Sequence, residues 1–173
     1  MGKQKKKDVF SNIAFGSVTE SAINTLTFSE INTGVSVHQK VAWVISRIAW
    51  HVKPATIFEL MLAGDNLDMA LTLNNKVDDL ANLSDPALLS RQGLYAHQMG
   101  TPASGMVVSQ PIEREFSSLP GGGMIVTPKP LYAAVKALGF STVAQVSCRI
   151  YFTVLELAAD EFWELVQASR IVQ

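Results

Sequence analysis

Residues 144–154 read AQVSCRIYFTV and form the most regular pattern in the chain. The even positions, from Ala144 to Val154, are apolar, whereas the odd positions carry Gln, Ser, Arg, Tyr and Thr. Because successive side chains of a β-strand point to opposite faces, this alternation predicts a strand with one buried face. Cys148 stands on the predicted buried face, where we expect an inert thiol and not a nucleophile.

The spacing of the apolar residues changes directly after this predicted strand. Residues 160–169 place Phe162, Leu165 and Val166 on one helical face, and acidic residues stand in the first turns. This pattern predicts an amphipathic helix whose charges suit the helix dipole. The chain is therefore expected to end on a helix that follows its most regular strand.

Upstream segments also favour strands. Residues 41–52 fit either a helix face or a strand, and their β-branched and aromatic content, with the stop at Lys53-Pro54, favours a long strand. The other predicted strands cover 21–31, 56–62, 67–73, 106–110, 112–116, 124–127 and 131–138. Turns are expected at 64–66 and at Pro120-Gly121-Gly122-Gly123. Ser84-Asp85-Pro86 is typical of a helix start and predicts a short helix over 87–91 that ends at Gly93.

About eight strands with two short helices, and no strand-helix alternation, indicate an all-β protein. The simplest architecture for one domain of this length is a single eight-stranded jelly-roll sandwich with short helices, one of them at the C-terminus. We expect residues 1–10 to form a basic N-terminal arm and residues 11–173 to form the sandwich domain.

The arm carries a cluster of positive charge. Its lysines are Lys3, Lys5, Lys6 and Lys7. Beyond residue 8 the chain has 10 basic and 14 acidic residues, so the rest of the protein is mildly acidic. The four lysines predict weak, salt-sensitive and sequence-independent contact with nucleic-acid phosphates, and a solubilising terminus is an equal alternative.

The composition favours association. Hydrophobic residues make up 48% of the chain and charged residues only 17%, below the roughly 25% of average soluble domains. This chain has few groups to solvate a monomer's surface, so we expect extensive contact with copies of itself. Trp43, Trp50 and Trp163 are core candidates first and contact anchors second. The terminal helix and the loop from 76 to 104 are candidate subunit contacts.

No catalytic constellation is evident. The three histidines have no metal-ligand spacing: His38, His51 and His97. The pairs Asp65/Asp68 and Asp78/Asp79 could contribute to a cation site, but solvated loop carboxylates are the favoured interpretation. The glycine run lacks the Gly-Lys-Ser/Thr of a phosphate-binding loop. We therefore expect no catalytic residues, no metal, no cofactor and no enzyme activity.

A membrane partner is not expected either. The richest apolar stretch, residues 41–52, is too short to span a bilayer and contains polar residues. The lysine-rich start is not followed by the apolar run of a signal peptide. These features predict a soluble, unprocessed protein.

Four segments carry a resemblance to a known group of proteins. Residues 119–139 (LPGGGMIVTPKPLYAAVKALG) and 146–170 (VSCRIYFTVLELAADEFWELVQASR) are its most specific part, with further likeness in 40–52 and 83–91. The chain resembles small single-jelly-roll viral capsid proteins, such as those of smacovirus-like or related tiny microbial viruses.

This resemblance implies a coat protein, located in the virion, that self-assembles in many copies into a closed icosahedral shell around a small genome. The lysine arm would then contact the packaged nucleic acid, although four lysines make a short arm for this group. The alternative from a different class is a lectin-like jelly-roll binding module on a larger assembly. An enzyme on a cupin-like barrel is disfavoured by the scattered histidines.

Overall fold

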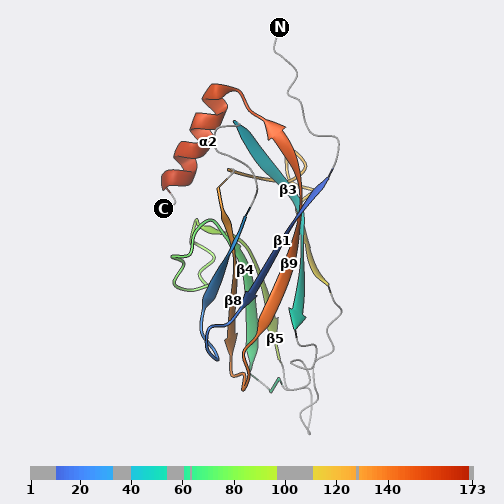
Figure 1. Ribbon diagram of the computed structural model, residues 1–173, viewed down its shortest axis with the longest axis vertical. Coiled ribbons are helices and arrows are strands. Elements are labelled where there is room, and N and C mark those ends of the chain that lie inside the picture. The colour runs from blue at the N-terminus through green and yellow to red at the C-terminus, as the bar shows by residue number, and fades with distance from the viewer. Residues whose placement is uncertain are drawn as a thin grey trace.

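The computed structural model consists of two facing antiparallel β-sheets and a C-terminal helix (Figure 1). The residues that it describes are 11–32, 40–53, 61–62, 64–96, 111–127 and 129–171, with side chains up to residue 167. The expected all-β sandwich is therefore confirmed at the level of two packed sheets. Within this part of the chain there are nine strands and one helix, where we expected about eight strands and two helices.

Each sheet combines strands from distant parts of the chain. Sheet A has the order β1 (Asn12–Thr19), β9 (Gln145–Glu156), β3 (Val41–Lys53), β6 (Ile112–Glu115), and β7 (Met124–Val126) also pairs with β3. Sheet B has the order β2 (Thr27–Ile31), β8 (Leu131–Leu138), β4 (Asn66–Thr72), β5 (Leu88–Tyr95). Helix α2 (Ala159–Ile171) follows β9 at one end of the sandwich (Figure 1).

The core lies between the sheets and follows the predicted alternation of β9. Val146, Cys148 and Ile150 are buried on its inner face, as the period of two predicts. Trp43 is fully buried and stacks on Phe152, with ring centroids 3.6 Å apart. Burial of such large apolar surfaces is the main force that holds the two sheets together.

A β-bulge explains why β3 resembles a helix in sequence. Its pairing with β9 shifts register between Ile45 and Arg47, and the extra residue, Ser46, donates a hydrogen bond from Oγ to the Tyr151 carbonyl (3.2 Å). Before the bulge Ile45 faces the core, and after it Ile48 does, so the apolar spacing changes from two to three. The predicted strand over 41–52 is confirmed.

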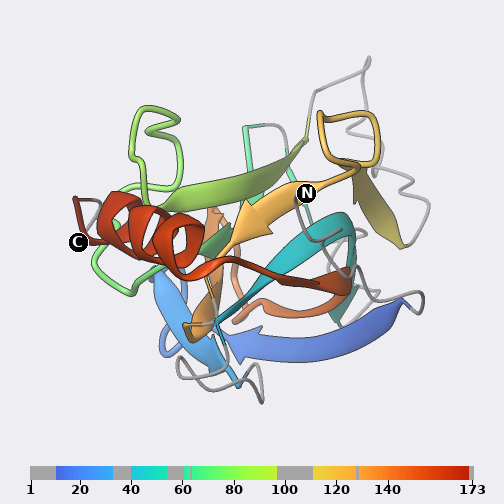
Figure 2. The ribbon, with the colours of Figure 1, turned by 90° about the horizontal axis from the view of Figure 1, so that it is seen from above.

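The outer faces of the two sheets differ. Ala70 and Ala134, on the outer side of sheet B, pack under the segment between β4 and β5 in a small second core with Val77, Leu80 and Ala87. Strand β1 lies at the edge of sheet A (Figure 2), and its outward side chains Ile13, Phe15 and Ser17 are exposed. The outward side chains of β9 are half-buried, except for the exposed Arg149. One sheet thus carries its own cover, and the other presents side chains to the surroundings.

The short helix predicted over 87–91 is wrong. Asp85 does form a turn, accepting hydrogen bonds from Ala87 N at its Oδ1 (2.8 Å) and from Leu88 N at its carbonyl (3.0 Å). The chain then pairs with β4 as β5, because the ladder satisfies its backbone groups and its apolar side chains join the core. Tertiary pairing here overrides a local capping signal.

The strands predicted for the N-terminal part of the chain also differ from those of the structure. Of the predicted strand 21–31 only Thr27–Ile31 is a strand, and Asn24 adopts a positive φ of 58° in the turn before it. Strand β1 was missed because its exposed side carries Ile13 and Phe15, so its sequence lacks polar alternation. The strand predicted over 106–110 and most of 56–62 lie outside the described residues. The other predicted strands and the C-terminal helix are confirmed.

A buried carboxylate joins the two sheets at one end. Glu20 follows β1 and accepts hydrogen bonds from Ala137 N on β8 (2.8 Å) and Ala144 N before β9 (2.9 Å). Both bonds are buried, and they satisfy backbone donors that lie between the sheets. No local sequence pattern indicates this role for Glu20.

Replacing Glu20 is therefore expected to destabilise the fold. In Glu20→Gln the amide offers one acceptor oxygen for two buried N–H groups, so one of them loses its partner. We expect the free energy of unfolding to fall by about 1–3 kcal/mol, measured by urea denaturation. The control is Glu30→Gln at an exposed position of β2. Equal stability of the two variants would contradict this role.

Candidate functional site

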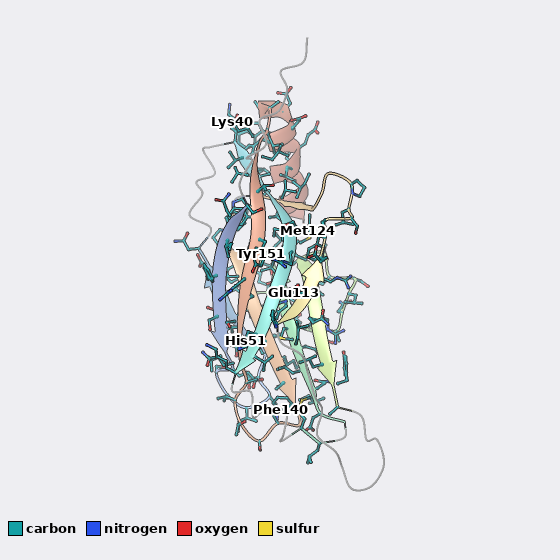
Figure 3. All side chains as sticks on the ribbon, turned by 90° about the vertical axis from the view of Figure 1, so that its right-hand side faces the viewer. Lys40, His51, Glu113, Met124, Phe140 and Tyr151 are labelled. Carbon is teal, nitrogen blue, oxygen red and sulfur yellow. The ribbon has the colours of Figure 1, made fainter. Side chains whose placement is uncertain are left out.

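A groove of about 720 Å³ lies on the outer face of sheet A. The edge strand β1 and the two central strands β9 and β3 supply its outward side chains, and Pro111 lies at its border. These side chains are Phe15 and Ser17 of β1, His51 and Lys53 of β3, and Ser147, Arg149 and Tyr151 of β9. Figure 3 looks toward this sheet, with Tyr151, His51 and Glu113 along its strands.

The strand register brings these residues together from distant parts of the sequence. Arg149 lies between Phe15 on β1 and Ala49 on β3, and Ser147 lies opposite His51. Directly opposed residues of an antiparallel pair have neighbouring side chains on one face. The small side chain of Ala49 leaves the hollow between Arg149 and the edge strand β6.

Cationic and aromatic side chains line the groove, and Arg47 lies beside the lining residue Tyr151. The guanidinium of Arg149 lies 5.7 Å from the ring centroid of Phe15, and that of Arg47 lies 4.0 Å from the ring of Tyr151. Arg47 also contacts Glu113 (3.5 Å) and Glu115 (4.0 Å) on β6. Among the described residues, neither Lys53 nor Arg149 has a carboxylate partner. The groove therefore has unneutralised positive charge, from Arg149 on β9 and Lys53 on β3.

The four predicted nucleic-acid-binding residues, Lys3, Lys5, Lys6 and Lys7, lie outside the described residues. Their place in the sequence is still informative, because Lys7 precedes the first residue of β1 by only five positions. Phe15 stands on that same strand. The sequence therefore connects the arm directly to one wall of the groove, a surface that was missed in the sequence analysis.

The predicted core positions of the tryptophans are correct in two of three cases. Trp43 and Trp50 are fully buried, whereas Trp163 is 54% exposed. Helix α2 buries Phe162 and Val166, and the residue next to Phe162 necessarily points about 100° away from it around the helix. Trp163 remains a candidate contact anchor.

The acidic pair Asp65 and Asp68 is buried, which corrects the expectation of solvated loop carboxylates. Asp65 Oδ2 accepts a hydrogen bond from Leu62 N (2.7 Å). Asp68 Oδ1 accepts bonds from Arg91 Nε (3.0 Å) and Nη2 (2.7 Å), and Tyr95 also contacts Arg91. Burial opposes the charge of Arg91, but Asp68 and Tyr95 together outweigh it and raise the pKa of Arg91 above its ordinary value. Both carboxylates thus have structural partners.

The remaining candidate groups do not form a reactive cluster. The described part of the chain contains no group of three or more His, Cys, Asp or Glu side chains placed to hold a metal ion. His51 is exposed in the groove, and His38 and His97 lie outside the described residues. The glycine run forms the predicted turn, in which Gly121 and Gly122 have φ of 87° and 77°.

No helix in the described ranges is long and apolar enough to cross a membrane.

Cys148 is expected to be inert in the folded protein. It is buried, and desolvation raises the pKa of its thiol to about 12, so the nucleophilic thiolate is scarcely populated at neutral pH. A disulfide reagent should therefore label native protein at least a hundredfold more slowly than protein in denaturant. Labelling of native protein at the rate of a free thiol would contradict this assignment.

Comparison of the chain with the sequence models of known protein families, and with curated proteins, finds no match.

Proposed function

We propose that this protein is a viral coat protein, which assembles in many copies into a closed icosahedral shell around a small genome and so resides in the virion. The proposal includes a jelly-roll fold for the sandwich. It is supported by the strand order, by the distribution of exposed apolar side chains and by the basic arm.

The strand order supports a jelly roll. Along the chain β1 lies in sheet A, β2 in B, β3 in A, β4 and β5 in B, β6 and β7 in A, β8 in B and β9 in A. Two interlocked Greek keys have such crossings between sheets. Strands β6 and β7 pair with successive stretches of β3, at 47–50 and 43–45, and so act as one strand interrupted by the glycine turn. Counted this way, the nine strands become eight.

The observation that carries the function is the spread of exposed apolar side chains over both ends of the sandwich. Leu138 and Val143 are exposed at the end marked by Phe140, and Trp163 is exposed on α2 near the end marked by Lys40 (Figure 3). Leu83 is exposed in the segment between β4 and β5. A two-fold dimer needs one self-complementary patch, whereas a shell needs contacts in several directions. The spread therefore favours many-copy assembly.

The basic arm supports enclosure of a genome. Each lysine can neutralise about one phosphate, and a single arm binds weakly. Many arms on one surface act together, because each bound arm raises the effective concentration of its neighbours. The exposed groove also fits the alternative of a lectin-like binding module, which would occur as a small oligomer of defined size.

Electron microscopy and sedimentation of the full-length protein at low and high salt test the proposal. We expect uniform closed shells whose ratio of absorbance at 260 and 280 nm indicates enclosed nucleic acid. A monomer, dimer or other small oligomer under all conditions would exclude the coat function for this chain alone and favour the binding module.

Trp163→Glu is expected to impair assembly without unfolding the subunit. The side chain is exposed within one subunit, so the change costs little there, but a buried charge at a contact costs about 2 kcal/mol or more. The shell fraction measured by sedimentation should fall at least tenfold. Gln167→Glu, at an exposed position of the same helix, is the matched control. Equal assembly of both variants would remove Trp163 from the contact surface.

Replacing Lys3, Lys5, Lys6 and Lys7 together with Gln is expected to reduce the enclosed nucleic acid. For single strands, the slope of log affinity against log salt should decrease in magnitude by about 3, since four phosphate contacts are lost. The control replaces the same number of lysines elsewhere: Lys40, Lys76, Lys129 and Lys136. If both quadruple variants lose nucleic acid equally, net charge and not the arm is responsible.

A further inference from the structure

The two outer faces of the sandwich differ in how far their side chains are covered. On sheet B, Val77, Leu80 and Ala87 cover the outward side chains. On sheet A, the groove between β1, β9 and β3 is open, and Phe15 at its wall is 66% exposed. Ile13, on the same face of this edge strand, is 46% exposed, and adjacent exposed apolar side chains indicate a surface that meets a ligand.

The charge of the groove narrows the class of ligand. Lys53 and Arg149 lie on its wall without a carboxylate partner among the described residues, and none of the described lining residues is acidic. The nearest described carboxylates on this face, Glu113 and Glu115, contact Arg47 at the β6 edge. The groove therefore complements an anion, and Arg149 adjoins β1, the strand that follows the lysine arm in the sequence.

The aromatic groups of the groove restrict the class of ligand further. Phe15 has Arg149 near one face of its ring, and Tyr151 has the planar guanidinium of Arg47 over its own ring. Aromatic rings and arginine planes on a sheet surface are the groups on which unpaired bases stack. A duplex keeps its bases stacked internally and would use only the positive charges.

We infer that this groove binds single-stranded nucleic acid, with a base stacked on Phe15, another against the Arg47–Tyr151 pair, and phosphates contacted by Lys53 and Arg149. The inference rests on the proposed function, which supplies the nucleic acid. It adds a binding site on the folded domain to the arm, and it makes the outer face of sheet A the inner wall of the shell.

Binding is tested by fluorescence anisotropy with labelled oligothymidylate and oligouridylate of about 16 nucleotides, the upper site size of single-strand-binding domains. A duplex of equal length is the comparison, and the two single strands separate DNA from RNA. The full-length protein is used throughout, and sedimentation of the same samples records its assembly state. We expect the single strands to bind more tightly than the duplex.

Two variants address the two kinds of contact. Lys53→Gln with Arg149→Gln should weaken single-strand binding at least tenfold and reduce the salt slope by about 1.4, as two phosphate contacts are lost. Phe15→Leu keeps an apolar side chain but removes the stacking face, so single-strand affinity should fall at least fivefold while duplex affinity is unchanged. Lys76→Gln with Lys136→Gln, which changes the net charge equally, should have no more than a twofold effect.

Ultraviolet cross-linking to the same oligonucleotides, read by mass spectrometry, locates the contact directly. Cross-links at Phe15 or Tyr151 support the groove. Cross-links confined to residues 1–10, or unchanged affinity in both groove variants, overturn it even when shells form. Loss of shells with unchanged oligonucleotide affinity also overturns it, because the groove is then a contact between copies. Groove cross-links in samples that never form shells would retain the site and reject the coat function.

Discussion

The pairing of β3 with β9 in the middle of sheet A is the constraint on which the rest of this structure depends. It joins the two longest strands, and it places Trp43, Trp50 and Ile150 toward the core. Because the side-chain period of a strand is two, the same register also decides which residues face outward. The side chains of the core and of the exposed groove thus lie on opposite faces of the same hydrogen-bonded strand pair. The bulge at Ser46 keeps apolar side chains on the core face on both sides of it.

The outer faces of the two sheets differ in the side chains that they carry. Sheet B has a small-residue outer surface, with Ala70 and Ala134, on which the segment between β4 and β5 packs. Sheet A presents long side chains instead, among them Arg47 and Arg149, whose guanidinium groups lie near the rings of Tyr151 and Phe15. The proposed coat function uses this difference, since a shell subunit has one face toward the genome and another toward the exterior.

The apolar excess of the composition is divided between core and surface. The sandwich buries Trp43 and Trp50, yet Trp163 and Leu138 remain exposed at opposite ends. With few charged residues to solvate such a surface, association with further copies is the simplest way to remove it from water. Composition alone predicted association, but only the arrangement of the exposed residues favours several contact directions over one.

The sequence by itself determined the elements whose signals are local. The alternation of β9, the glycine turn before β7 and the amphipathic helix α2 are all readable from neighbouring residues, because strand and helix periods and positive φ are properties of short segments. Tertiary structure alone decided that residues 88–95 form a strand, that Glu20 and Asp68 are buried with partners, and that Phe15 adjoins Arg149. Each of these depends on the pairing of segments distant in sequence, and no local pattern records which strands will be neighbours.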